Sequence, residues 1–395
     1  MQKQKAQIYY SSIHFFYWMA HATVCSFCSA FLLHNGYSSS EIGLILAMGY
    51  AGSILLQPCL AQFADRTRKF LLPDLLRAVF GIYLLLSGLV LVLQGRSIFL
   101  SVFYILVYVI HSSVVPLLNE LNYYLEAAGN RMNYGAARAV GSFGYSIMST
   151  AAGFAAEKAG YWTVPALTTV SAGMVLLLLC MHGKIADGRH RNPGAEPEKS
   201  GGMAGFVQEH PDSFLTAAGC GFLMFSTITT ANYLLQIMEN VGGTTKDMGF
   251  GLSLAAIAEI PVMFFYSRLS RRYSPGMMLK AAAIGYVIKQ TILLSAGRCE
   301  TVLFSQLFQM VSFALYLPAS VAYAHETSTP HDSVKAQALF NAMSTGSGLL
   351  ASLAGGFIID RFGVRSLLIL CLITSLLGMI LIFLSARTGK KVCRR

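Results

Sequence analysis

Apolar residues run in long blocks along the whole chain and are separated by short polar segments. A block of about 20 apolar residues has the length of a helix that crosses the hydrocarbon core of a bilayer. We count twelve such blocks and predict one membrane-spanning helix for each, over residues 8–33, 41–63, 71–94, 98–125, 135–157, 162–183, 212–237, 247–266, 277–296, 300–323, 336–359 and 364–386. The pattern therefore predicts an all-α membrane protein with twelve transmembrane helices.

One polar segment is much longer than the others. Residues 184–211 are rich in Gly, Pro and charged side chains, a composition typical of a flexible linker. The segment lies between the sixth and seventh predicted spans. We therefore expect an N-terminal six-helix bundle over residues 1–183, a cytoplasmic linker over 184–211, and a C-terminal six-helix bundle over 212–395.

A weak internal repeat supports this division. The sequence AAGFAAEKAGYW (residues 151–162) closes the fifth predicted span, and LAGGFIIDRFGV (residues 353–364) closes the eleventh. At one offset, a Gly-Phe pair, an acid–base pair and a final Gly align. This match is expected if two six-helix halves repeat in parallel orientation, as in some secondary transporters.

Composition and charge distribution agree with the membrane prediction. Hydrophobic residues make up 55% of the chain and charged residues only 12%, whereas soluble proteins carry about 25% charged residues. Of the 29 Lys and Arg residues, 21 fall on the side of the N-terminus, 6 on the other side, and two inside predicted spans. Because basic residues collect on the cytoplasmic side, both termini are expected in the cytoplasm. The same rule explains the net charge of +11 without nucleic acid as a partner. We expect a multi-pass protein of the cytoplasmic (inner) membrane of a bacterium.

Apart from the charged residues assigned to span ends, four Asp, Glu, Lys and Arg residues lie within predicted spans: Glu120, Arg138, Glu259 and Lys289. A charge at membrane depth is costly, so it needs a partner or a function. Glu120 lies about two turns before a short polar hairpin within residues 119–144, and Arg138 about one turn after it. We expect them at similar depth, either as a solute site or as a structural ion pair.

Catalytic and metal-binding patterns are weak. The sequence has no HExxH or GxSxG motif, so we do not expect an enzyme. Cys25 and Cys28 form a CxxC with no second pair and no accompanying His cluster, which indicates packing residues and no metal or disulfide. No cofactor is implied.

His21, near the middle of the first span, is expected either to line a cavity or to be a satisfied buried side chain. Asn232 is expected to donate hydrogen bonds to a solute.

After the second predicted span comes LLQPCLAQFADRTRKF (residues 55–70), an acid followed by bases. This segment resembles the loop after helix two in the major facilitator superfamily. The leading Gly of that pattern is Ala61 here, and the loop is shorter. The resemblance implies a twelve-helix major facilitator fold in two six-helix pseudo-repeats, and a gating role for the charged residues of the loop, Asp65, Arg66, Arg68 and Lys69.

A closer resemblance is to the oligosaccharide:proton symporter (lactose permease-like) branch, through FYWM in the first span, LLQP in the second, and YGAARAVGSFGY (residues 134–145). It implies that Arg138 and Glu120 bind sugar hydroxyls, and that Tyr145 replaces a Trp that stacks on the sugar. A planar guanidinium, a carboxylate and an aromatic face suit that task chemically.

The second half departs from the branch. Lys289 falls on an arginine near the proton site, while the coupling His and Glu fall on Gln309 and Ser312, which do not ionise. We therefore predict that the Glu259 carboxyl group titrates and that Lys289 tunes its pKa. The alternative is a static Glu259–Lys289 salt bridge. Gln309 is predicted to join the solute site.

The sequence thus predicts a secondary active transporter that works by alternating access. We expect proton-coupled symport of a small polar solute such as a sugar or glycoside. The alternative is a nucleoside or aromatic-acid symporter on the same scaffold. The expected partners are the solute, protons and membrane lipid, and the expected state is a monomer.

Overall fold

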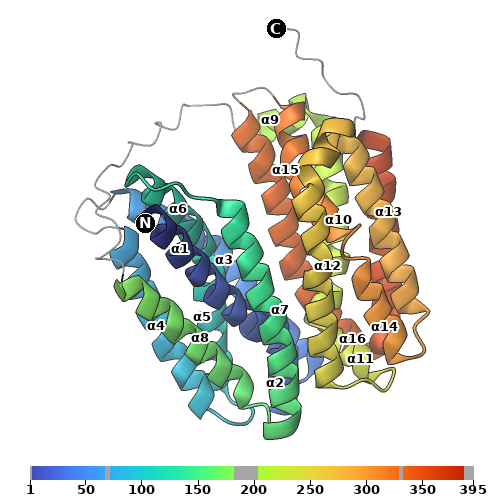
Figure 1. Ribbon diagram of the computed structural model, residues 1–395. Coiled ribbons are helices and arrows are strands. Elements are labelled where there is room, and N and C mark those ends of the chain that lie inside the picture. The colour runs from blue at the N-terminus through green and yellow to red at the C-terminus, as the bar shows by residue number, and fades with distance from the viewer. Residues whose placement is uncertain (1, 67–71, 182–202, 329–331, 387–395) are drawn as a thin grey trace. The chain divides into compact units, whose positions relative to one another are not determined.

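The computed structural model describes residues 2–66, 72–181, 203–328 and 332–386 (Figure 1). Within these ranges every regular element is a helix, which confirms the predicted all-α class. Contacts divide the chain into two units: Met1–Gly194 with Thr244–Ser253, and Ala195–Gly243 with Leu254–Arg395. The boundaries predicted for the two bundles, at 183 and 212, stay a prediction.

The described residues of the first unit form eight α-helices and one π-helical turn: α1 (Gln2–His21), η1 (Ala22–Ser26), α2 (Cys28–His34), α3 (Ser39–Arg66), α4 (Leu72–Val92), α5 (Ile98–Ser113), α6 (Val115–Ala127), α7 (Tyr134–Ala159) and α8 (Thr163–Cys180). Helix α1 packs along α7 and α8, α4 along α8, and α3 along α5 (Figure 1). The Asn133 side chain caps α7 by accepting from Ala136 N at 3.0 Å, and Gly160, with a φ of 101°, ends it. These two residues set the limits of the helix that carries Arg138.

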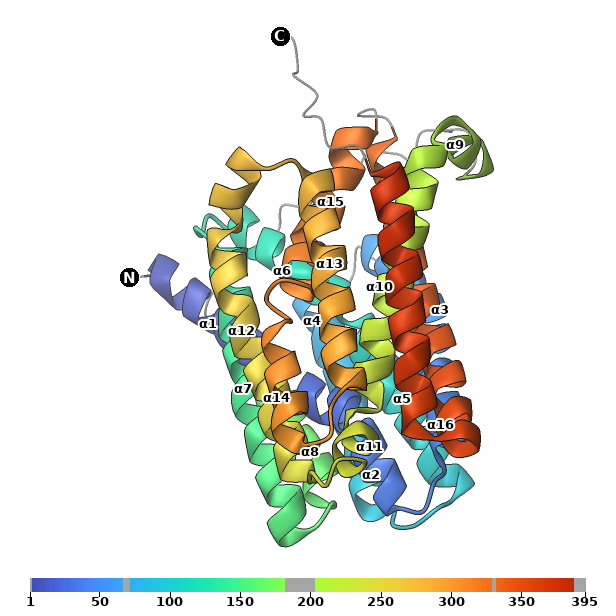
Figure 2. The same cartoon turned by 90° about the vertical axis from the view of Figure 1, so that its right-hand side faces the viewer.

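The second unit contains the remaining helices: α9 (Met203–Glu209), α10 (Pro211–Asn232), α11 (Leu234–Glu239), α12 (Thr245–Arg272), α13 (Pro275–Leu294), α14 (Cys299–Leu307), α15 (Phe313–Thr327) and α16 (Ser333–Ser385). The first turns of α12 group with the first unit by their contacts. Helix α16 lies along α10 and α13 (Figure 2). Helix α9 falls inside the predicted linker, so residues 203–209 are helical where we expected flexible chain.

Helix α16 combines the eleventh and twelfth predicted spans. Gly363, with a φ of 79° and a ψ of 173°, interrupts its helical geometry between them. An L side chain rarely adopts that conformation, so glycine is what permits a corner there. By length and composition, eight described helices can cross a membrane, or nine if the bent pair Lys5–Ser26 and Cys28–His34 counts as one span.

Four of the predicted spans are broken part-way along. In the first unit, the first span passes through η1 and bends, and the fourth breaks at Val114 between α5 and α6. In the second unit, the seventh span breaks at Tyr233, and the tenth is non-helical from 308 to 312. The breaks therefore fall in the first and fourth predicted spans of each half. Broken helices at membrane depth are tolerated where they are buried in protein or line a cavity.

Candidate functional site

The break in the fourth span follows from a proline. Pro116 has no N–H, so the carbonyl oxygen of Ser112 cannot receive its helical hydrogen bond. It accepts from Gln57 Nε2 at 3.2 Å instead, and the carbonyl oxygen of His111 accepts from the Tyr17 hydroxyl at 2.9 Å. Gln57 and Tyr17 belong to the LLQP and FYWM segments of the sequence. These segments therefore stabilise the break.

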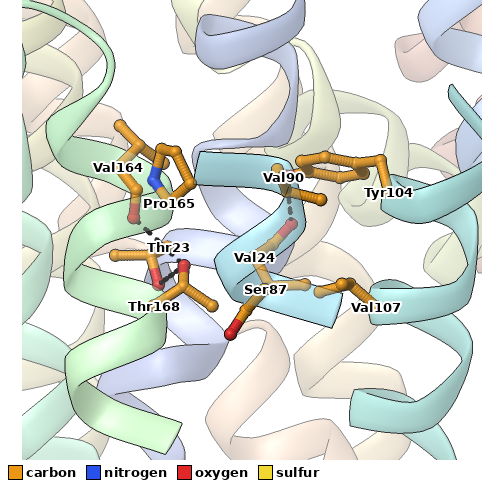
Figure 3. Close-up of a pocket in the computed structure, with 9 residues that line it drawn as sticks. All are labelled: Thr23, Val24, Ser87, Val90, Tyr104, Val107, Val164, Pro165 and Thr168. Atoms are coloured by element: carbon orange, nitrogen blue, oxygen red, sulfur yellow. Dashed lines mark hydrogen bonds between the residues drawn. The ribbon is translucent and has the colours of Figure 1, made fainter. Parts of the chain in front are cut away.

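The break in the first span is a π-helical turn that neighbouring helices hold in place. The Val24 carbonyl oxygen accepts from the Tyr104 hydroxyl at 2.9 Å, and the Thr23 hydroxyl accepts from Thr168 at 2.8 Å (Figure 3). A cavity of about 10 Å³, counted as the space open to the centre of a water molecule, lies between these side chains. That space admits about one water. Such turns are frequent at functional sites.

Arg138 is the main charged residue of the first unit's site. Its guanidinium carbon lies 3.8 Å from the centre of the Trp18 ring, and its Nη1 donates to the Ser142 hydroxyl at 2.9 Å. Gly141 makes room for the indole, since a Cβ there would overlap the Trp18 ring. The arginine is thus held by an aromatic face and by its own helix, and it is half-buried.

Tyr145 lies two turns after Arg138 on the same face of α7. Its hydroxyl shares a hydrogen bond of 2.8 Å with the hydroxyl of Ser26, the last residue of η1. Its ring centre is 6.1 Å from that of His21. The structure therefore brings Arg138, Tyr145 and His21 to one region beside the break in the first span.

His111 also belongs to this region, and the sequence analysis did not assign it to the site. Its Nε2 lies 3.2 Å from Nδ1 of His21, and the Tyr17 ring stacks on it at 4.5 Å with an interplanar angle of 5°. Trp18, Ser26 and Ser142 were likewise missed. The sequence did hold one signal for the extent of this site: Trp18 precedes His21 by three residues and so lies on the same helix face.

Glu120, the predicted partner of Arg138, lies on α6 with an exposed side chain. Its pairing with Arg138 stays a prediction. For the predicted gate, Asp65 and Arg66 fall in the last turn of α3, but their side chains lie outside the described residues. Arg68 and Lys69 also lie outside them.

In the second unit, Gln309 bridges Lys289 and Glu259. The Lys289 ammonium donates to Oε1 of Gln309 at 2.7 Å, and Nε2 of Gln309 donates to Oε1 of Glu259 at 3.1 Å. Lys289 is only 4% exposed, while Glu259 and Gln309 are half-buried. The three residues come from α13, α12 and the broken segment of the tenth span. An amide that accepts from the cation and donates to the carboxylate keeps both charged groups hydrogen-bonded.

Asn232, at the break in the seventh span, has a different environment. Its Nδ2 donates to the Ser352 hydroxyl of α16 at 3.0 Å, and the residue is 8% exposed. The neighbouring Tyr233 donates its hydroxyl hydrogen to the Ser352 carbonyl oxygen at 2.6 Å. In the structure Asn232 therefore joins two helices, and the solute contact predicted for it stays a prediction.

Comparison with known proteins identifies the family to which this chain belongs. A model of the "MFS_1 like family" matches residues 7–370. The chain belongs to this family. It is a transporter of the major facilitator type and a multi-pass membrane protein, as the resemblance in the sequence implied.

Two bacterial transport proteins resemble this chain over most of its length. The chain is 25% identical to "Maltose permease" of Geobacillus stearothermophilus, over 89% of this chain and 86% of the relative. It is 23% identical to "Probable 3-phenylpropionic acid transporter" of Escherichia coli (strain K12), over 89% of this chain and 90% of the relative. The crystal structure of a variant of the nucleoside transporter NupG superposes with a TM-score of 0.75 at 12% identity, covering 96% of this chain and 98% of that one. That likeness shows the fold.

Proposed function

We propose that this chain is a proton-coupled symporter that imports a small polar solute, a sugar or glycoside, by alternating access across the cytoplasmic membrane of a bacterium. It would work as a monomer, with both termini in the cytoplasm. The relatives named above come from bacteria, and one of them is a maltose permease.

Twelve spans are part of this proposal. Helix α16 counts as two spans when it is divided at Gly363, and α14 with α15 counts as one span interrupted at 308–312. Helix α7, with 26 residues, is long enough to cross the hydrocarbon core. An even number of spans agrees with the excess of Lys and Arg in the loops assigned to the cytoplasm.

The observation that carries the solute assignment is the placement of Arg138 against Trp18, with Tyr145 two turns away on the same helix. A guanidinium donates to two neighbouring hydroxyl oxygens at once, and aromatic faces cover the apolar side of a pyranose ring. Ser26 and Ser142 add hydroxyls that both donate and accept. Glu120 would accept from the solute's hydroxyls.

The Lys289–Gln309–Glu259 bridge supports the coupling assignment. We propose that Glu259 takes up the proton, and that Gln309 passes the change of charge to Lys289 by reorienting its amide. The alternative is a fixed salt bridge between Glu259 and Lys289, in which Glu259 does not take up a proton. Asp65, Arg66, Arg68 and Lys69 would gate the cytoplasmic side as the halves move.

Transport in reconstituted vesicles tests the proposal. Vesicles with a pH-sensitive dye inside would receive labelled maltose, uridine or 3-phenylpropionate, with and without an inward proton gradient. We expect the sugar to accumulate with the gradient, and sugar entry to acidify the lumen. Accumulation of the nucleoside or the aromatic acid alone would favour the alternative function. Substrate-driven acidification that persists in Glu259→Gln would refute the role of Glu259.

A further inference from the structure

Three metal-binding side chains of the first unit converge at the break in the first span. The candidate ligand atoms of His21, Cys25 and His111 all lie within 4.8 Å of one another. Nδ1 of His21 and Nε2 of His111 are 3.2 Å apart. Two nitrogen ligands at about 2.0–2.1 Å from one ion are about 3.3–3.6 Å apart in tetrahedral or trigonal geometry. The histidine pair therefore needs only a few tenths of an ångström of movement to hold an ion.

The π-helical turn is what adds the thiol. His21 ends α1 and Cys25 follows four residues later within η1, while His111 comes from α5. The hydrogen bonds from Tyr104 to the Val24 carbonyl oxygen and from Thr168 to the Thr23 hydroxyl hold the turn in place (Figure 3). The ligands are thus placed by tertiary contacts, which is why the sequence alone indicated no histidine cluster near the CxxC.

The surroundings hold one ligand residue more firmly than the other two. Tyr17 stacks on the His111 ring and also donates to its carbonyl oxygen, so the ring is held by its neighbours. His111 is 1% exposed, whereas His21 and Cys25 are half-buried. The ring of His111 is therefore preset, and the other two ligand residues are the less enclosed part of the site.

Charge selects the kind of ion. The Trp18 ring lies 4.8 Å from that of His21 and carries the Arg138 guanidinium on its face. A further positive charge buried beside this arginine is costly. Two neutral imidazoles and one thiolate leave a Zn²⁺ complex with one positive charge but make a Cu⁺ complex neutral. Thiolate is also a preferred ligand of Cu⁺.

We propose that His21, His111 and Cys25 form a binding site for one Cu⁺ ion. On binding, the Cys25 thiol releases its proton to water, and the imidazole that donates in the His21–His111 hydrogen bond moves its proton to its other ring nitrogen. The thiolate sulfur and the two freed nitrogens become ligands with no change in oxidation state. The ion ties η1 to α5 and so fixes the first and fourth spans to each other at their breaks. Bound Cu⁺ therefore inhibits any transport that needs these breaks to move.

The test titrates the purified full-length protein with Cu⁺, without oxygen, against a chromogenic Cu⁺ chelator. The exposed thiols Cys59 and Cys180, and Cys393, are first replaced by serine to remove unrelated binding. We expect one Cu⁺ per transporter and one proton released. Cys25→Ser and His111→Gln should each weaken binding by at least about 100-fold, because loss of a ligand costs no less than the roughly 10–100-fold that loss of a supporting partner costs. Because binding is measured directly, a failure of the transport proposal does not affect this result.

Two matched variants act as controls. Cys28→Ser removes a buried thiol three residues away, and His14→Gln removes a buried histidine from the same helix as His21. Both should retain the Cu⁺ site. Thermal unfolding of Cys25→Ser without copper shows whether that variant is folded. If the folded variant binds Cu⁺ as tightly as its parent, or if both controls lose the ion equally, the site is wrong. Tighter binding of Zn²⁺ than of Cu⁺ would overturn the charge argument.

Discussion

Gln309 accepts a hydrogen bond of 2.7 Å from the ammonium of Lys289, which is 4% exposed. The amide thereby satisfies a buried cation, and its other end donates to Glu259. In the resemblance to the lactose permease-like branch this position falls on an ionisable histidine, so the resemblance predicts a group here that relays hydrogen bonds where the branch has one that titrates. This relationship makes Gln309 the most informative position of the second unit.

Gln309→Leu should destabilise the protein and abolish coupled uptake. The substitution leaves the Lys289 ammonium without this acceptor, at a cost of about 1–3 kcal/mol. Gln309→Glu restores an acceptor for Lys289 but replaces the donor to Glu259 with a second carboxylate oxygen, so it should recover only part of the thermal stability and should change the pH profile of uptake. Thermal unfolding in detergent and uptake at two pH values measure both effects.

The control for that experiment is Gln306→Leu, one turn earlier. Gln306 is also buried, but its Nε2 donates to the Val302 carbonyl oxygen and the Ser305 hydroxyl of its own helix. It should tolerate the change better than Gln309 and keep the coupling. Equal losses in the two variants would mean that the Lys289–Gln309 contact has no special role.

Tryptophan fluorescence should report solute binding through Trp18. The chain has two tryptophans, and Trp162 is 51% exposed whereas Trp18 carries the Arg138 guanidinium. We expect a transported sugar to change the emission of the protein, because it displaces or reorients the cation over the indole. The change should persist in Trp162→Phe and disappear in Trp18→Phe.

Arg138→Lys provides an independent measurement of the same contact. It keeps the charge but loses the planar fork, so the KM for sugar uptake should rise about tenfold or more. An unchanged KM would remove Arg138 from the solute site.

The unbroken helices could be predicted closely from hydrophobic pattern alone. Helix α7 covers Tyr134–Ala159 where we expected 135–157, and α13 covers Pro275–Leu294 where we expected 277–296. None of the four breaks could be predicted from the hydrophobic pattern, although Pro116 is a local signal for the break in the fourth span. The carbonyl oxygen of Val24, for example, leaves the α-helical pattern and accepts from Tyr104, 80 residues away. An apolar block specifies a length in the membrane, whereas a break depends on such distant partners.

The candidate site shows the same limit. Arg138 and Lys289 stood out in the sequence because a charge inside an apolar block is costly. His111 and Trp18 did not, since buried histidines and aromatic runs are common in spans without any function. Their roles depend on contacts between α1, α5 and α7 that no spacing within one segment encodes.

Tyr104→Phe should destabilise the first unit by weakening the π-helical turn. The lost hydroxyl leaves the Val24 carbonyl oxygen without its 2.9 Å partner, which costs about 1–3 kcal/mol in a buried setting. Tyr123→Phe is the matched control, because Tyr123 is 63% exposed. Thermal unfolding should separate the two variants clearly. If both unfold at the parent's temperature, the hydrogen bond to Val24 does not support the turn.

Gly355→Ala should disturb the break in the seventh span. A Cβ at Gly355 would overlap the ring of Tyr233, which is fully buried and forms the break between α10 and α11. Tyr233 is also held by its hydroxyl on the Ser352 carbonyl oxygen, one turn before Gly355 in α16, so its ring cannot move aside freely. Overpacking of this kind costs about 1–3 kcal/mol.

Gly346→Ala in the same helix is the control. A Cβ there meets no atom within 4 Å, and alanine should stabilise the helix by up to about 1 kcal/mol. Thermal unfolding of the two variants should therefore shift in opposite directions. A shift of the same sign and size in both would show that helix propensity, and not the Tyr233 contact, decides the effect.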